Sequence, residues 1–195
     1  MSLTTPVDIQ RALEGLQGLN FNELLKNPLT SINSDSTENV PPLRISLQSL
    51  TSMHQPQKTS ILYANPEDQS GRLLPFCQSI LNAFKEIPKE NGESLVISEN
   101  RPLLLHATIV NTTYAKGPRG SSGNAAGQRS HGKHRGKITI DATDILTKYS
   151  DYTWMKDIRI EKLAICRMGA QKILGEEGET TGDEEYVVEG EVELP

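Results

Sequence analysis

The sequence predicts an α+β domain with antiparallel sheets. Three observations predict this class: segments of helical and of strand periodicity are interleaved, the gaps between strands near both ends have the length of hairpins, and no repeat of solenoid length is present. A chain of 195 residues is long enough for one domain with its own core. We therefore expect a single domain over residues 1–195, with flexible insertions at about 27–42, 115–136 and 174–185.

The first half of the chain predicts a helix followed by two strands. Thr5 fits an N-cap that precedes a proline at the first helical position, and four apolar residues follow at helical spacing: Ile9, Ala12, Leu13 and Leu16. The Ser- and Pro-rich stretch 27–42 indicates a loop, and the alternation at 43–48 indicates a half-buried strand. A second strand is expected at 59–64, with a turn at 65–68 after it.

An apolar stripe predicts the next helix. Ser70 is in place to cap it. The stripe consists of Leu73, Phe76, Cys77, Ile80, Leu81 and Phe84.

The strongest strand signal lies at 103–113, which has little charge and several strand-forming residues. Strand alternation would put four of its residues on one face: Leu104, His106, Thr108 and Val110. Further strands are expected at 137–141, 158–168 and 186–194, and a short helix at 142–149. The Gly-rich stretch 117–136 and the acidic stretch 176–185 indicate loops.

Charge is segregated along the chain. The formal net charge of −5 gives no general attraction to nucleic acid or to an anionic membrane. Residues 115–137 nevertheless contain six Lys or Arg, two His and no acid, whereas residues 176–195 contain nine acids and no base. The acidic segment is most simply a solvated hairpin.

Cysteine use and hydropathy favour an intracellular, soluble protein. The cysteines are Cys77 and Cys166, each inside an apolar pattern, which argues against a disulfide framework and favours a reducing compartment. No apolar run approaches the roughly 20 residues of a membrane helix. The segment 1–5 is not a signal peptide.

His106 and Thr108 are the candidate catalytic residues. Two residues apart on one strand, they would point to the same side of a sheet, about 6 to 7 Å apart along the strand. An imidazole can transfer a proton near neutral pH, and a hydroxyl can hold a phosphoryl oxygen. The alternative is a core histidine satisfied by a neighbouring carbonyl, with Thr108 present as a strand former. Spacing alone favours that alternative, because His-x-Thr is common by chance.

The wider sequence adds a family resemblance. The segments 103–112, 136–146 and 163–169 resemble the second half of the A-kinase anchoring protein 7-like phosphoesterase domain, a member of the 2H phosphoesterase superfamily. The resemblance implies a bilobal, 2′-5′ RNA ligase-like α+β fold in which two His-x-Ser/Thr motifs face each other. It also implies that one histidine acts as general base and the other as general acid on a 2′,3′-cyclic or 2′-5′ phosphodiester, without a metal or other cofactor.

His106 and Thr108 match the second motif, and no segment matches the first. His54 has Pro56 at the hydroxyl position, and His131 and His134 lie in the Gly-rich loop. The family places the first motif on a strand before the first helix. We therefore expect that strand to lie upstream of Met1 and so to be missing from this sequence. General acid or base help is worth about 10²- to 10⁴-fold per group, so the chain as written is expected to be inactive or nearly so.

The resemblance also implies partners. Members of this family include a subunit of the activating signal cointegrator 1 complex, a nuclear assembly in transcription regulation and DNA alkylation repair. We therefore expect a nuclear subunit, present also in the cytoplasm, that binds an RNA or nucleotide phosphodiester and cointegrator-complex proteins, and no membrane. One alternative is an active phosphodiesterase whose first motif lies upstream, and another is a scaffold that binds proteins through its charged loops.

Three further residues are candidates for substrate binding. Tyr114 follows the motif strand and could stack on a base, or equally cap the strand. Lys116 and Arg119 begin the basic loop and could contact phosphates, or serve only to solvate an insertion. His131 and His134 make a poor metal site, because no carboxylate or cysteine accompanies them.

Overall fold

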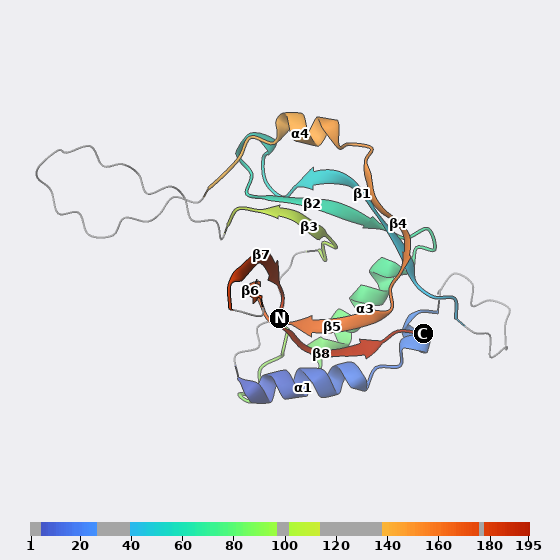
Figure 1. Ribbon diagram of the computed structural model, residues 1–195. Coiled ribbons are helices and arrows are strands. Elements are labelled where there is room, and N and C mark those ends of the chain that lie inside the picture. Colours follow the sequence, from blue (N-terminus) through green and yellow to red (C-terminus); the bar gives the residue numbers. More distant parts are fainter. Residues whose placement is uncertain (1–4, 27–39, 97–101, 114–137, 176–177) are drawn as a thin grey trace, which may run out of the picture. The chain divides into compact units, whose positions relative to one another are not determined.

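The computed structural model describes residues 5–26, 40–96, 102–113, 138–175 and 178–195 (Figure 1). The chain divides into two compact units. Unit 1 comprises 1–44, 68–103 and 158–195, and unit 2 comprises 45–67 and 104–157. Helices combine with antiparallel strand pairs, so the predicted α+β class is confirmed.

Unit 1 packs helices on a strand pair. Its elements are α1 (Pro6–Gln17), α2 (Phe21–Leu24), α3 (Leu73–Lys85), β5 (Lys162–Cys166), β6 (Gln171–Leu174), β7 (Thr180–Glu185) and β8 (Val188–Glu193). Strand β5 pairs with β8, and β6 pairs with β7, both antiparallel. Helix α1 lies against β8, and Gly190 permits the close approach, because a Cβ there would lie 2.4 Å from Leu13 Cδ2.

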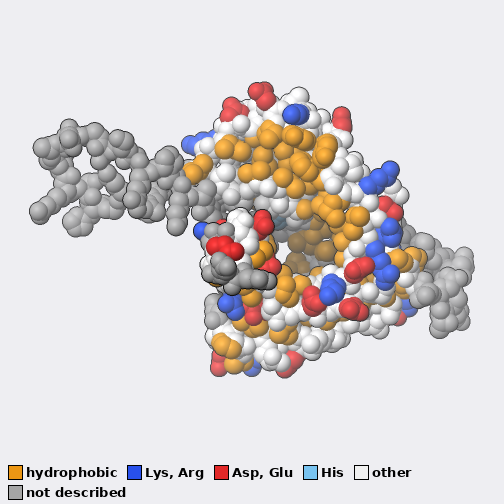
Figure 2. Space-filling view, viewed as in Figure 1, with side chains coloured by type: hydrophobic (Ala, Val, Ile, Leu, Met, Phe, Trp, Pro, Cys, Tyr) orange, Lys and Arg blue, Asp and Glu red, His pale blue; other side chains and the backbone are white. Residues whose placement is uncertain are grey.

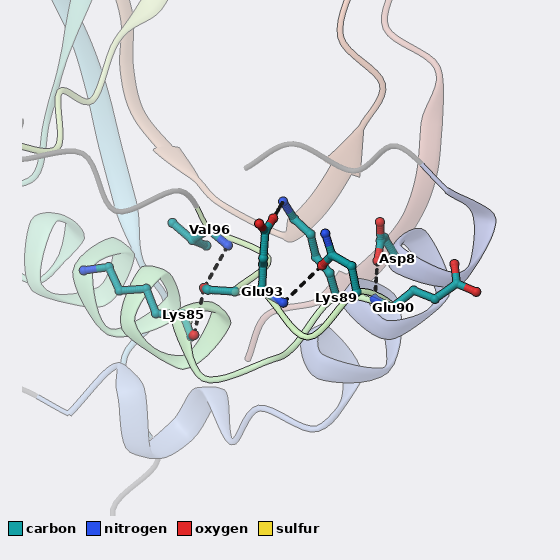
Figure 3. Close-up of polar contacts among 8 residues, drawn as sticks. Asp8, Lys85, Lys89, Glu90, Glu93 and Val96 are labelled. Carbon is teal, nitrogen blue, oxygen red and sulfur yellow. Dashed lines mark hydrogen bonds and ion pairs between the residues drawn. The ribbon is translucent and has the colours of Figure 1, made fainter.

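Helix α1 forms as its sequence predicts. The Thr5 hydroxyl accepts the Asp8 N–H at 3.1 Å, and Ala12 and Leu16 lie in the core beside Phe84 of α3. Asp8 is only 2% exposed, and its carboxylate also accepts the Glu90 N–H at 3.0 Å (Figure 3). That backbone hydrogen bond is the largest influence on Asp8 and, despite the cost of burial, holds the pKa of its carboxyl below the ordinary value.

Helix α3 has its predicted apolar stripe but not its predicted cap. Asp68 accepts the Arg72 N–H at 2.6 Å and the Leu73 N–H at 2.8 Å, while Ser70 donates its hydroxyl to the same carboxylate. The prediction that Ser70 caps α3 was therefore wrong. The carboxylate of Asp68, two residues earlier, accepts the first N–H groups of the helix, and its negative charge interacts favourably with the positive end of the helix dipole. Burial raises the pKa of Asp68, but these hydrogen bonds outweigh it and lower the pKa overall.

Arg72 ties together two segments that are distant in sequence. Its side chain is buried, and its guanidinium donates to the carbonyls of Leu25, Pro41 and Pro42 at 3.3, 2.9 and 3.2 Å. Leu25 precedes residues 27–39 and the two prolines follow them, so Arg72 holds together the described residues on either side of that segment. Leu25, Leu43 and Phe76 share the adjoining core cluster with Leu194.

Unit 2 is built on a four-stranded sheet. Its elements are β1 (Arg44–Ser52), the 3-10 helix η1 (Pro56–Lys58), β2 (Ile61–Glu67), β3 (Ala107–Asn111), α4 (Thr143–Lys148) and β4 (Thr153–Arg159). The strand order is β3-β2-β1-β4, with β2 antiparallel to both β1 and β3. The core on one face of the sheet contains Leu50, Leu62 and Ala142. Ala142 is the residue immediately before α4. The Trp154 indole donates to the Ser49 carbonyl at 2.7 Å, which links β4 to β1.

Several sequence predictions of local structure were wrong. Most of the expected turn at 65–68 belongs to β2, which continues to Glu67, and Pro66 pairs with Leu47. Strand β3 pairs with β2 only as far as Ala64. Pro66 lies beyond this pairing, so its lack of an N–H leaves no hydrogen bond to β3 unmade. Of the expected strand at 137–141, only an isolated bridge between Ile140 and Thr59 is described.

The C-terminal third also differs from the prediction. Strand β4 was not expected, and the expected strand at 158–168 is divided between the end of β4 and β5. The acidic loop expected at 176–185 contains β7. Residues 181–185 of this strand are all exposed and therefore show no apolar alternation, and Gly182 adopts a φ of 91° within it. None of the described helices has the length and apolar character needed to cross a membrane.

We predict that Arg72→Met destabilises unit 1. Three buried or half-buried carbonyls lose their donor, which should lower the free energy of unfolding by about 2 to 4 kcal/mol. Urea denaturation followed by circular dichroism measures the change. Arg11→Met is the matched control, because Arg11 donates to a single carbonyl, that of Pro88, at an exposed position. Equal effects of the two substitutions would contradict the role given to Arg72.

A second prediction concerns how the stability contributed by Asp8 depends on pH. Since the native pKa of Asp8 is lowered, its contribution to stability is complete above the ordinary value of 3.8 and is lost as the pH falls through the native pKa. Asp8→Asn should therefore lower the urea midpoint at pH 7, and the difference from wild type should shrink below about pH 4. Glu14→Gln, an exposed change on the same helix, is the control. A difference that persists unchanged at pH 2 would show that the charge of Asp8 is not responsible.

Candidate functional site

His106 lies immediately before β3 and is exposed. Its Nδ1 is 3.0 Å from the Leu104 carbonyl oxygen. A carbonyl only accepts, so Nδ1 carries the hydrogen in this contact and Nε2 is left to exchange a proton with a ligand. The imidazole does contact a neighbouring carbonyl, as the alternative interpretation proposed, but it is not a core histidine.

A one-residue bulge in β3 determines where Thr108 points. Leu62 pairs with Val110, whereas Tyr63 pairs with Thr108, so Ile109 is the extra residue. Directly paired residues of antiparallel strands point to the same side of a sheet. Thr108 therefore shares the face of Tyr63, and Val110 shares the opposite face with the core residue Leu62. The prediction that Thr108 and Val110 share a face was wrong, because the bulge shifts the alternation by one residue.

Tyr63 connects His106 to the sheet. Its side chain is 6% exposed, and its ring centroid lies 5.6 Å from that of His106 at an interplanar angle of 71°. This is an edge contact, the favoured arrangement of two aromatic rings. On the other side Tyr63 pairs with Thr51 of β1, so a row of side chains runs from Thr51 through Tyr63 to Thr108.

A second row of polar side chains lies next to this one. Asn65 of β2 pairs with Gln48 of β1, and its Nδ2 lies 3.0 Å from Ser49 Oγ and 2.9 Å from Thr51 Oγ1. The last pair between β2 and β3 is Ala64 with Ala107. The next residue beyond this pair is Asn65 on β2 and His106 in the segment before β3, so both follow on the side of the sheet that carries Tyr63 and Thr108. This face of the sheet, which we call the polar face, carries Thr51, Tyr63, Asn65, Gln48, His106 and Thr108.

The sequence analysis did not select Tyr63, Asn65 or Thr51. A usable signal was present, because Tyr63 and Asn65 alternate with the buried residues Leu62 and Ala64. That alternation marks a strand with one apolar and one polar face, and a polar face on the strand beside His106 is a candidate site.

The polar face can hold an anion and exchange one proton with it. Thr108 and His106 are both exposed on the same side of the sheet. The hydroxyl can donate, and the imidazole Nε2 can accept a hydrogen bond from a ligand, or donate one when the ring is protonated. The neutral side chains Thr51, Gln48 and Asn65 add hydrogen-bonding groups without a negative charge. A phosphodiester oxygen suits this combination of a titratable ring and neutral donors.

The remaining candidates lie outside the described residues. They are Tyr114, Lys116, Arg119, His131 and His134, together with the rest of the basic loop. His54 is described and lies in the turn after β1, where it is exposed. Within the described ranges, no group of three His, Cys, Asp or Glu side chains could hold a metal ion.

Other surface features lie away from the polar face in sequence or on the sheet. A shallow hollow lined by residues 18–22 and 193–195 belongs to unit 1, whereas His106 and Thr108 belong to unit 2. Hydrophobic side chains gather beside α4 in Figure 2. Tyr149, Tyr152 and Trp154 form an aromatic cluster, and Tyr149 and Trp154 pack on the Leu62 side of the sheet, opposite Tyr63.

Comparison with known proteins gives a match over most of the chain. A family model described as AKAP7 2'5' RNA ligase-like domain matches residues 1–177, a range that includes the polar face. The uncharacterized protein C15D4.13c of Schizosaccharomyces pombe is 26% identical over 125 residues. That alignment covers 63% of this chain and 46% of the yeast protein, so the chain spans about half the length of this curated relative.

Proposed function

We propose that this chain, which belongs to the AKAP7 2'5' RNA ligase-like domain family, binds the phosphodiester of an RNA end or nucleotide through His106 and Thr108. The match to that family carries the proposal, since it covers residues 1–177 and its description names a 2'-5' RNA ligase-like domain. The position of the two side chains on the polar face supports it. The imidazole Nε2 would donate to or accept from the diester, and the Thr108 hydroxyl would hold a phosphoryl oxygen.

We further propose that binding exceeds turnover in this chain. Opening a phosphodiester needs one group that removes a proton and another that supplies one. His106 has one nitrogen available, because Nδ1 is engaged with the Leu104 carbonyl. The loss of one member of a catalytic pair removes most of the acceleration that the pair provides, about 10²- to 10⁴-fold for one group.

An active 2′,3′-cyclic or 2′-5′ phosphodiesterase is the second candidate. It requires a second His-x-Ser/Thr motif from a longer form of the protein. The yeast relative favours this candidate in one respect, because less than half of its length aligns with this chain. A longer form that opens uridine 2′,3′-cyclic phosphate, and loses that activity on His106→Gln, would replace the binding proposal with this one.

The cellular role is proposed from the family resemblance. We propose a mainly nuclear protein, present also in the cytoplasm, that works with proteins of the activating signal cointegrator 1 complex in transcription regulation and DNA alkylation repair. Mass spectrometry of proteins captured with a tagged chain from nuclear extract should detect subunits of that complex. Their absence from captures that retain RNA binding would remove this part of the proposal.

The binding proposal predicts a specific loss on substitution of His106. Titration calorimetry with uridine 2′,3′-cyclic phosphate should give a dissociation constant about 10- to 100-fold higher for His106→Gln, the range expected for one hydrogen bond to a charged group. Thr108→Val should raise it by roughly threefold to tenfold, as expected for a hydrogen bond from a neutral hydroxyl. His54→Gln is the matched control, because it removes an exposed histidine elsewhere in unit 2. If all three variants bind as wild type does, the polar face is not the binding surface.

A further inference from the structure

We infer that Tyr63 is a positioning residue for His106, one that fixes the direction in which the imidazole presents Nε2. This inference deepens the proposed function and rests on it for its biological meaning. It concerns how the binding group is oriented and adds no contact with the ligand. Three features of unit 2 carry it.

The first feature is that the β-ladder does not hold His106. Strand β3 begins at Ala107, and its pairing with β2 ends at the Ala64–Ala107 pair. The hydrogen bond of the imidazole is local, to the carbonyl of Leu104, which is itself 49% exposed and also lies outside β3. A bond to so exposed a segment sets the ring relative to its own backbone but not relative to the sheet.

The second feature is that Tyr63 is rigidly placed. It lies on β2, an inner strand of the sheet, and pairs with Thr51 on one side and with Thr108 on the other. Its neighbours Leu62 and Ala64 are 0% exposed, and its own side chain is 6% exposed. A close-packed side chain of this kind has a single rotamer. The ring therefore gives His106 a fixed reference on the sheet.

The third feature is the contact itself. The two rings meet edge-on with their centroids 5.6 Å apart. A contact of this type shifts a rotamer equilibrium by roughly twofold to tenfold, which is sufficient to select one orientation of an exposed imidazole. Because Thr108 is the β3 partner of Tyr63, the same ring lies beside both functional groups.

The aromatic ring, and not the hydroxyl, should carry this role. Within the described part of the chain, the Tyr63 hydroxyl makes no hydrogen bond, and its contact with His106 is between the rings. Tyr63→Phe keeps the ring and removes the hydroxyl. Tyr63→Leu removes the ring and keeps an apolar side chain at a nearly buried position. The pair of variants therefore separates the two groups.

Two measurements on the full chain test the inference. Proton NMR of the imidazole, assigned by the signals lost in His106→Gln, reports the ring current of Tyr63 and, through ring-nitrogen correlations, which nitrogen carries the hydrogen. Calorimetry with uridine 2′,3′-cyclic phosphate reports binding. Tyr152→Leu is the matched control, since Tyr152 contacts Trp154 and Tyr149 in the aromatic cluster. Circular dichroism melting identifies any variant that fails to fold.

We expect Tyr63→Leu to move the His106 ring signals toward those of the exposed His54 and to weaken binding threefold to tenfold. Tyr152→Leu should leave both readouts at wild-type values, and Tyr63→Phe should keep the ring-current shift of His106 and weaken binding less than Tyr63→Leu does. Unchanged ring signals in a folded Tyr63→Leu variant would overturn the inference, as would Tyr63→Phe weakening binding as much as Tyr63→Leu. If wild type does not bind the cyclic phosphate but Tyr63→Leu still moves the ring signals, the proposed function fails and the positioning role stands.

Discussion

The extra residue in β3 is the constraint on which the candidate site depends. Without Ile109 as a bulge, Val110 could not reach the core beside Leu62 while Thr108 lies beside Tyr63, because a regular strand puts residues two apart on one face. The core therefore fixes the orientation of Thr108 indirectly. The single bulge in β3 therefore turns Val110 toward the core and the Thr108 hydroxyl toward the polar face.

The sequence predicted those elements whose burial is periodic. Helices α1 and α3 were predicted from the spacing of their apolar residues, the short helix α4 was expected at 142–149, and β1, β2, β5 and β8 were located to within a few residues. Strands β4 and β7 were missed, since their exposed residues leave no apolar alternation. The Asp68 cap depends on which side chain reaches the first N–H groups of α3, and the β3 bulge depends on how β3 pairs with β2. Neither feature leaves a distinct local pattern in the sequence. His106 and Thr108 were selected as candidates through a motif, whereas Tyr63 is selected only through its contacts.

The ionisable groups of the two units serve different purposes. In unit 1, the Asp8 carboxylate accepts the Glu90 N–H and the Arg72 guanidinium donates to carbonyls, so these two charged groups join segments that are distant in sequence, whereas Asp68 accepts backbone N–H groups at the start of α3. In unit 2, the polar face around His106 is lined mainly by neutral hydrogen-bonding side chains. Stability and binding can therefore be altered by substitutions in separate places.

The geometry of phosphoryl transfer explains why one such face favours binding over catalysis. The attacking and leaving oxygens lie roughly in line on opposite sides of phosphorus in the transition state. Two proton carriers must then approach from opposite sides, and side chains on one face of a sheet approach from the same side. The pairing adds one carboxylate to this face, Glu67 opposite Ser46, and it lies on the same side of the sheet as His106. In the proposed function, the polar face of unit 2 would supply one of the two proton carriers and the hydroxyl that holds the phosphate, and cleavage would require a second carrier on the other side of the diester.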